Sequence, residues 1–390
     1  MTQPIPTPGL DAGARTLVEG NTAFALDLYQ QLRQEEGNLF FSPYSISTAL
    51  AMTYAGARGV TEAQMADALH LLLPQDALHP AFAKLEALLR DIQASGDVQL
   101  SVANALWPHV EYRFLDSFLD LVKVNYGVSL TAVDYRDPEA ARQQINAWVE
   151  QKTNDKIQNL IPLGTIKTLT RLVLTNAIFF KGNWASQFDE ARTRDADFAL
   201  LSGKRVAVPM MAQKLECGYG ETDDLQILEL PYVGDALSMI VLLPRTVDGV
   251  AALEARLTPD TLERWTKRLR ETKVEVFLPR FKLSAAFRLD EVLKAMGMID
   301  AFELFRADFS GLDGADMLFI SAVLHKAFVD VNEEGTEAAA ATAVVMEFKG
   351  PPPPAPVFRA DHPFIFLIRE NSTGSLLFLG RVLDPAAPET

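Results

Sequence analysis

The 390-residue sequence has a single cysteine, Cys217, and no pattern of histidines that would hold a metal ion. One cysteine excludes an internal disulfide and a cysteine-based metal site, and a thiol without a histidine partner is typical of a structural residue. His70, His79 and His109 show no metal-ligand spacing. We therefore expect neither a disulfide nor a metal site.

The sequence also lacks any long apolar run. A membrane-spanning helix needs about 20 consecutive apolar residues, and no stretch approaches that length. The first residues, MTQPIPTPGLDAG, contain no basic segment followed by an apolar one, as a secretory signal would. We expect a globular protein with no membrane partner, which is cytoplasmic or already processed.

Positive charge is scarce. The chain has 36 Lys and Arg residues against 51 Asp and Glu residues, which gives a net charge of −15 at pH 7. Such an acidic chain argues against a nucleic-acid partner and against polyanions such as heparin. We expect a cationic partner more readily than an anionic one.

No hydrolase motif is present. Asp361 directly precedes His362, which superficially suits a catalytic triad, but there is no G-x-S-x-G sequence and no nucleophile tied to the pair. We expect that the protein is not an enzyme. His325 shares its strand parity with Ala327 and Val329, which predicts a buried, hydrogen-bonded structural histidine.

The order of helical and strand patterns indicates the fold class. The chain shows no repeat and no polar linker, so we expect one domain over residues 1–390, with residues 1–14 disordered and residues 386–390 frayed. Helical patterns crowd the first half of the chain and strand patterns follow. This order predicts an α+β protein with large mixed sheets.

Local signals place several of the elements. Apolar residues from Phe24 to Leu32 predict an amphipathic helix, Thr61 and Gln64 predict a capping box at a second helix, and Asp137-Pro138 predicts the start of a third. Six apolar or alternating runs predict strands: 171–180, 237–244, 273–279, 318–331, 363–370 and 374–382.

One stretch fits none of these elements. Residues 333–356 read EEGTEAAAATAVVMEFKGPPPPAP. As a strand, the run from Thr336 to Met346 places small or apolar side chains on one face and Glu337 and Glu347 on the other. The prolines at 351–354 prevent the strand from continuing and favour an extended spacer. We interpret the stretch as a loop that can join a sheet once its far end is released.

The chain resembles an inhibitory serpin. The resemblance rests on motifs that span nearly the whole chain: NLFFSPYSISTALAM (38–52), NAIFFKGNW (176–184), ELPY (229–232), MIVLLP (239–244), HKAFVDVNEEGTEAAA (325–340), FRADHPFIFLI (358–368) and FLGRVLDP (378–385). It implies a single-domain serpin fold of three β-sheets and eight or nine helices, with a hinge and an exposed reactive-centre loop over residues 333–357. We further expect a monomer and a prokaryotic source.

The resemblance also implies roles for particular residues. The shutter beneath the opening strands would be Ser42, Ser45, Asn176 and His325, and Trp184 would lie at the breach where insertion starts. The hinge would consist of Glu333, Glu334, Gly335, Thr336, Glu337, Ala338, Ala339, Ala340 and Ala341. Small residues in the hinge would let it enter a sheet rapidly, because bulk or charge on the inward face would cost several kcal/mol.

Two counts disagree on the reactive bond. Counting from Glu333 in the usual serpin register leads to Lys349, and counting back from Phe358 leads to about Pro352. Most serine proteases cleave poorly before proline, which favours the Lys349–Gly350 bond. Lysine is bait for trypsin-like enzymes, and Phe348 and Met346 remain alternatives.

The resemblance implies a suicide substrate of a serine protease that forms a covalent acyl-enzyme and needs no cofactor. The alternatives are a non-inhibitory serpin with a chaperone, carrier or storage role, and an inhibitor of a chymotrypsin-like, subtilisin-like or cysteine protease.

Overall fold

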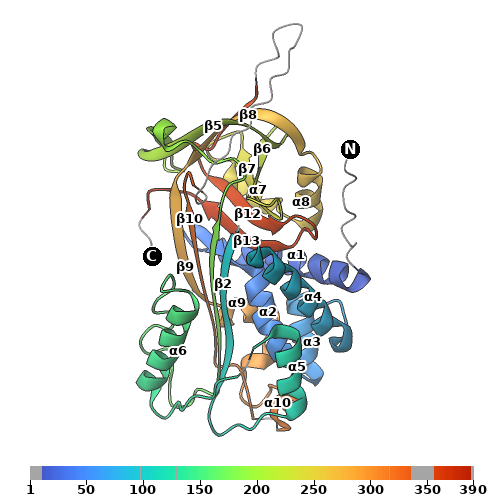
Figure 1. Cartoon of the computed structure of the whole chain (residues 1–390). Helices are drawn as coiled ribbons and strands as arrows, with labels where there is room; N and C mark the ends of the chain where they lie inside the picture. Colours follow the sequence, from blue (N-terminus) through green and yellow to red (C-terminus); the bar gives the residue numbers. More distant parts are fainter. Residues whose placement is uncertain (1–10, 97, 129, 316, 335–354, 388–390) are drawn as a thin grey trace.

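A computed structural model of the chain describes residues 11–96, 98–128, 130–315, 317–334 and 355–387. Ten α-helices are described: α1 (Ala12–Leu32), α2 (Pro43–Tyr54), α3 (Gly59–Ala68), α4 (Gln75–Ala94), α5 (Asp116–Tyr126), α6 (Pro138–Lys152), α7 (Val250–Ala255), α8 (Pro259–Thr266), α9 (Asp290–Ala295) and α10 (Ser310–Asp313). The helices α1 to α5 lie on one side of a long sheet, α6 lies on its other side, and a second group of strands lies beyond one end of it (Figure 1).

The long sheet, here called the central sheet, has four strands in the order β2-β3-β10-β9. These are β2 (Val98–Pro108), β3 (Leu172–Gly182), β10 (Ala322–Val331) and β9 (Phe281–Arg288). The outer pairs are antiparallel, whereas β3 and β10 run parallel from Ala322 opposite Val173 to Val329 opposite Phe180.

The other strands form one nine-stranded network. Its path is β1-β13-β12-β7-β6-β5-β8-β11, and β4 pairs with β5. The bounds are β1 (Leu39–Phe41), β4 (Arg194–Ala199), β5 (Arg205–Glu221), β6 (Leu225–Pro231), β7 (Leu237–Pro244), β8 (Arg270–Pro279), β11 (Val357–Arg359), β12 (Phe364–Glu370) and β13 (Leu376–Val382).

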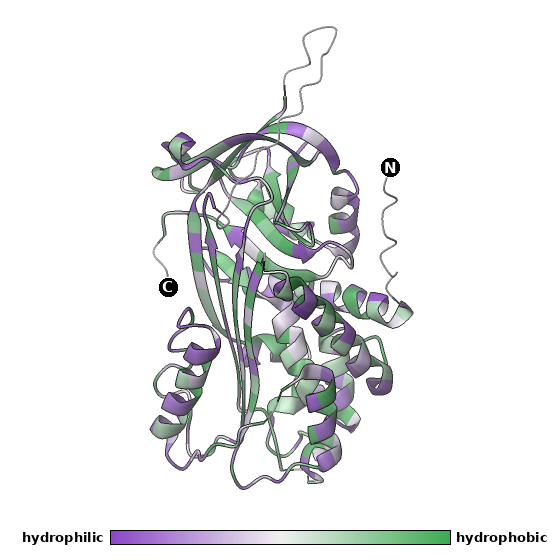
Figure 2. Ribbon diagram, in the orientation of Figure 1, coloured by the Kyte–Doolittle hydropathy of each residue, from purple (hydrophilic) through white to green (hydrophobic). Residues whose placement is uncertain are grey.

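Both faces of the central sheet are covered, which explains why its strands are apolar almost throughout. Ile145 and Val149 of α6 pack over Ala322 and Leu324 on one face. On the opposite parity, Ala327 belongs to the main core, together with α2. Hydrophobic colour accordingly follows the buried strands, while the outer helices show hydrophilic faces (Figure 2). None of the described helices is long and apolar enough to cross a membrane.

Sequence signals located these elements with one error. The six predicted strands appear as β3, β7, β8, β10, β12 and β13, and Asp137 caps α6 by accepting a hydrogen bond from the Ala140 amide at 3.1 Å. The predicted capping box is wrong, because α3 begins at Gly59. The Thr61 hydroxyl accepts instead from the Asp308 amide at 2.9 Å, and Gln64 accepts from the Asp300 amide at 2.7 Å.

Three further expectations need adjustment. Residues 1–14 were expected to be disordered, but Asp11 caps a helix that begins at Ala12. Ten α-helices are described where eight or nine were expected, because α7, α9 and α10 are only 6, 6 and 4 residues long. The structure has two strand networks where three sheets were expected. The reason is that the 17-residue strand β5 pairs with β4, β6 and β8 and so joins two groups of strands into one.

A buried ion pair connects α7 to the last strand, and its carboxylate also binds the first helix. Glu254 of α7 accepts from Arg381 of β13 at 3.0 Å and from the Tyr29 hydroxyl of α1 at 2.8 Å. The Arg381 guanidinium also donates to the carbonyl oxygen of Gly37 at 2.8 Å. The Glu254 and Arg381 side chains are each 6% exposed, and Arg33 lies 3.7 Å from the same carboxylate, so Arg381 depends on Glu254 for its charge partner.

We predict that Glu254→Ala lowers the urea midpoint of unfolding strongly, at a cost of about 3–5 kcal/mol, because it leaves the Arg381 charge buried and unpaired. Glu263→Ala is the control, because Glu263 pairs with Lys267 at the surface and such pairs contribute at most about 1 kcal/mol. Equal urea midpoints for the two variants would show that the buried pair contributes no more stability than the surface pair.

Candidate functional site

The predicted loop leaves the described structure beside the central sheet and re-enters it on the other network. β10 ends at Val331, and the chain is described to Glu334. The remaining hinge residues, Gly335 to Ala341, and the candidate bait residues Met346, Phe348, Lys349 and Gly350 lie outside the described residues. Past them, the Pro356 carbonyl accepts from the Glu275 amide at 2.9 Å, and β11 pairs with β8.

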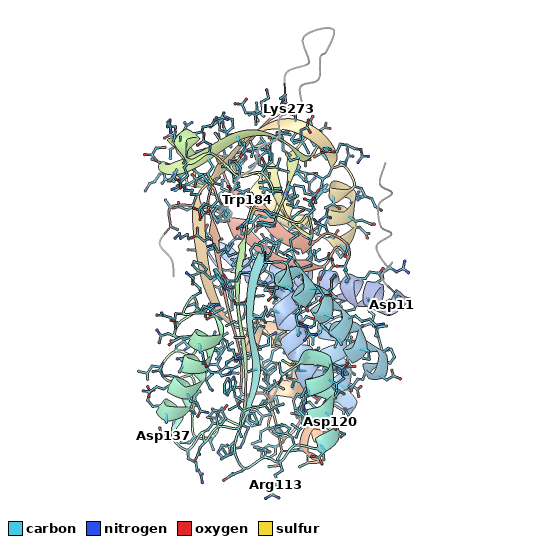
Figure 3. The ribbon with its side chains drawn as sticks, in the orientation of Figure 1. Asp11, Arg113, Asp120, Asp137, Trp184 and Lys273 are labelled. Atoms are coloured by element: carbon cyan, nitrogen blue, oxygen red, sulfur yellow. The ribbon has the colours of Figure 1, made fainter. Side chains whose placement is uncertain are left out.

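Trp184 (labelled in Figure 3) lies just past the end of β3 and contacts the chain just past the end of β10. Its indole nitrogen donates to the Asn332 carbonyl at 2.9 Å, and its ring stacks on Tyr232 with 4.7 Å between the ring centroids. The Glu333 carbonyl accepts from the Phe188 amide at 3.1 Å, and the Glu334 carbonyl accepts from the Gln187 side chain at 2.9 Å. Backbone contacts therefore hold the start of the hinge against the segment that follows β3.

Glu333 is also held by its side chain, which is only 1% exposed. Its carboxylate accepts from the Arg280 guanidinium at 2.5 Å and from the Thr193 hydroxyl. Burial alone would raise the pKa of Glu333, but these two hydrogen bonds lower it below the ordinary value, so the carboxylate stays charged. The sequence reading missed Arg280 and Thr193, because both come from elements distant in the chain.

The four predicted shutter residues meet beneath the central sheet. His325 of β10 lies directly opposite Asn176 of β3, and their side chains are hydrogen-bonded. The side-chain amide of Asn176 donates to the Ser45 hydroxyl at 2.6 Å, and the backbone N–H of Ser42 donates to Nε2 of His325 at 3.1 Å. The Ser42 hydroxyl donates to the Leu377 carbonyl of β13 at 2.6 Å. The proximity of the four residues is thus observed, while their gating role stays a prediction.

A fifth residue, Asn104 of β2, belongs to the same network. Its side-chain oxygen accepts from the Ser45 hydroxyl at 3.0 Å and from the Asn176 amide. The sequence carries a signal for it, since Asn104 shares the strand parity of Leu100 and Leu106, which lie in the main core. A polar residue on an apolar strand face needs a buried partner.

The network fixes the state of His325. Its Nε2 accepts a backbone N–H, so Nε2 is unprotonated and Nδ1 carries the proton donated to Asn176. The residue is fully buried, and burial lowers its pKa to about 3. His325 is therefore a neutral structural link between β10, β3 and α2.

His362 is equally unsuited to act as a catalytic base. Its Nδ1 lies 2.8 Å from the Asp361 carboxylate, and its Nε2 lies 2.7 Å from the Pro244 carbonyl. Burial opposes protonation, but these two acceptors raise the pKa of His362 above its ordinary value. Both ring nitrogens are thus engaged. No group of three or more possible metal ligands occurs within the described part of the chain.

Comparison with known proteins gives one consistent result. The model of the family Serpin (serine protease inhibitor) matches residues 19–385. Human Serpin B3 is 42% identical over 389 residues, covering 95% of this chain and 100% of that protein. Human leukocyte elastase inhibitor is 44% identical over 381 residues, covering 95% and 99%.

The comparisons also bear on source and fold. A serpin-like protein of Thermococcus kodakarensis is 42% identical over 374 residues, covering 95% of this chain and 86% of that protein. Because human proteins match as well, the expected prokaryotic source finds no support. The structure of uncleaved ovalbumin superposes with a TM-score of 0.84 at 31% identity, covering 95% of this chain and all of that one. The expected fold class is thereby confirmed.

We predict that the stability of the protein falls as the pH drops from about 6.5 towards 3. Between these pH values the His325 side chain binds a proton in the unfolded chain but not in the folded protein. This difference lowers the free energy of unfolding by up to about 1.4 kcal/mol per pH unit. His79, whose pKa burial lowers to about 4, acts in the same direction. His325→Gln should therefore flatten the dependence of the urea midpoint on pH between 6.5 and 5 without abolishing it.

NMR of the wild-type protein supplies a second measurement that does not depend on the variant folding. The ring signals of His325 should stay constant from pH 8 to 5. A His325 signal that titrates near pH 6.5 would contradict the neutral, buried assignment.

Proposed function

The chain belongs to the serpin family of serine protease inhibitors, and from this membership we propose that it is a suicide substrate of a trypsin-like serine protease. The observation that carries the proposal is the strand arrangement at the centre of the central sheet. There β3 and β10 are parallel neighbours, and the chain leaves β10 directly into the predicted hinge.

The first step is an ordinary attack on the reactive bond. The protease serine adds to the Lys349 carbonyl, the bond to Gly350 breaks, and the amine of Gly350 leaves with the proton from the serine. The product is an ester that links the protease to Lys349. A peptide ester of this kind is normally hydrolysed in the second half of the protease cycle.

The second step competes with that hydrolysis. Released from residue 350 onward, residues 335–349 insert between β3 and β10, antiparallel to both. The insertion replaces one parallel ladder with two antiparallel ladders, and antiparallel pairing is slightly more stable per residue. About 15 residues at about 3.3 Å each carry the tethered protease roughly 50 Å, away from the geometry that deacylation needs.

Two sets of contacts set the barrier to insertion. At the upper end, Glu333 must keep or exchange its bonds to Arg280 and Thr193 as the hinge turns into the sheet. Lower down, separating β10 from β3 breaks the contact between His325 and Asn176. We propose that these contacts hold the uninserted form kinetically rather than as the lowest-energy state.

The bait residue determines which protease is trapped. We propose Lys349, whose side chain matches the acidic primary pocket of trypsin-like enzymes. Phe348 and Met346 remain candidates for chymotrypsin-like or subtilisin-like targets. The relative named leukocyte elastase inhibitor supports an apolar alternative, because elastase has a small, apolar primary pocket.

The proposed partner is the protease alone. The net charge of −15 argues against nucleic acid and heparin as partners, and the mechanism requires no metal or other cofactor. We propose a monomer, because inhibition by insertion uses one loop and one sheet of the same chain.

Mixing the protein with trypsin, chymotrypsin and subtilisin separately tests the proposal. We expect a covalent band on denaturing gels at about the sum of the two masses, and a released fragment beginning at Gly350 by mass spectrometry. Cleavage without a covalent band for all three enzymes would favour the non-inhibitory alternative.

We predict that Thr336→Arg converts the protein from inhibitor to substrate, because a charged side chain on the inward face opposes burial of the new strand. The ratio of protein to protease needed for full inhibition should rise several-fold. Thr336→Ser is the matched control and should leave that ratio unchanged. Full inhibition by Thr336→Arg would exclude insertion as the mechanism.

We predict that Lys349→Ala abolishes inhibition of trypsin, because the acidic pocket then has no partner. Inhibition of chymotrypsin or subtilisin by the same variant would show that the loop still inserts. Unchanged inhibition of trypsin would move the reactive bond away from Lys349.

A further inference from the structure

A cavity of about 310 Å³ lies where the helices of the N-terminal half meet the edge of the central sheet. Its described walls come from α2, α4, β2, the end of α5 and α6. Figure 1 shows α5 and α6 on the two sides of β2. The volume is about ten times the roughly 30 Å³ that one water molecule occupies in the liquid, so a small organic molecule fits.

One carboxylate lines this cavity among the residues that the structure describes, that of Glu86 on α4. The Tyr44 hydroxyl donates to it at 2.6 Å, and Tyr44 is only 2% exposed, so the carboxylate end of Glu86 lies inside the protein. Within the described chain this is its one hydrogen bond, and it has no ion pair. A buried carboxylate without a charge partner is costly, and a cation in the cavity would supply that partner.

The pKa of Glu86 reflects the same surroundings. Burial raises it above the ordinary value, while the hydrogen bond from Tyr44 and the charge of Arg90, one turn further along α4, lower it. Arg90 is exposed and acts from a distance, so it does not replace a partner inside the cavity. A cation that binds there gains an attraction that water screens less than it would at the surface.

Aromatic side chains form another part of the wall. Trp148 of α6 and Tyr126 of α5 both line the cavity. The Trp148 ring is fixed edge to face against Trp107, with 5.1 Å between the ring centroids. The ammonium of Lys152 lies 5.8 Å from the centroid of Trp148, so this ring already attracts a cation of the chain itself.

The charges in the wall select the class of ligand. An anion would meet the Glu86 carboxylate, and the one cationic side chain among the described lining residues, Lys152, is exposed and lies over Trp148. A neutral ligand would leave Glu86 without a charge partner. Only a cation gains from both the carboxylate and the aromatic rings.

We propose that this cavity, here called the Glu86 cavity, binds a small organic cation that carries an ammonium or guanidinium group on an aromatic or apolar body. The cationic group pairs with the Glu86 carboxylate, and the body packs on Tyr126 and Trp148. No step of loop insertion enters this inference, so it stands or falls independently of the proposed function.

Occupancy of the Glu86 cavity has a consequence for the fold. Its wall joins Thr48 and Met52 of α2 to Val102 and Asn104 of β2, and the Asn104 side chain accepts from the Ser45 hydroxyl in the shutter network. A ligand that contacts α2, α4, β2 and α6 together binds the folded chain and not the unfolded one. It therefore raises the stability of the protein by mass action.

Isothermal titration calorimetry with matched probes tests the ligand class. Phenethylammonium, phenylguanidinium, phenethyl alcohol and phenylpropionate share an aromatic body and differ in charge. We expect the two cations to bind at one site per chain with a dissociation constant of about 1 mM or tighter, and the alcohol and the acid to bind at least about tenfold more weakly. The urea midpoint of unfolding should rise in the same order.

These wild-type measurements do not depend on any variant folding. Equal affinity for all four probes would overturn the assignment of a cation. A protein that binds neither cation at about 50 mM would overturn the site itself.

Glu86→Gln locates the charge partner, because glutamine keeps the shape and an acceptor oxygen for Tyr44 but loses the charge. We expect phenethylammonium to bind about tenfold more weakly to this variant. Asp120→Asn is the matched control, because Asp120 is exposed on α5 (labelled in Figure 3) and outside the cavity lining. An equal loss in both variants would assign the binding to the general negative charge of the chain and overturn the site.

Lys152→Met supplies a test with the opposite sign. Removing the ammonium frees the Trp148 ring and takes away a like charge, so phenethylammonium should bind about twofold to threefold more tightly. Weaker binding to this variant would show that the ligand is held by Lys152 rather than in spite of it, and would overturn the assignment of a cation.

Discussion

The structure depends on the pairing of β3 with β10 at the middle of the central sheet. Each strand has a second, antiparallel neighbour, β2 or β9, so separating the middle pair would leave both halves of the sheet intact. Eight residue pairs join the two strands, from Ala322 to Val329 on β10. Of the three strand pairs in this sheet, it is the one between which a further strand would not displace an antiparallel partner.

Polar contacts are concentrated along this seam. His325 and Asn176 lie opposite each other within it, and Ser42 and Ser45 connect the pair to α2. A fully satisfied buried network is stable as a unit, whereas a partly broken one leaves polar groups without partners at a cost of about 1–3 kcal/mol each. The seam therefore resists small separations more than an apolar contact of the same area would, as the proposed mechanism requires of the uncleaved protein.

The sequence predicted the elements of this site better than their partners. Alternation around His325 was sufficient to bury it, and Asp137-Pro138 was sufficient to start α6, because both signals are local. The capping box predicted from Thr61 and Gln64 was wrong, because their side chains instead bind the backbone at Asp308 and Asp300, more than 200 residues away. Arg280 and Thr193 were missed for the same reason, because no local pattern shows that a charged side chain will meet Glu333. The hinge and bait residues could be assigned only by resemblance, and of these only Glu333 and Glu334 are among the described residues.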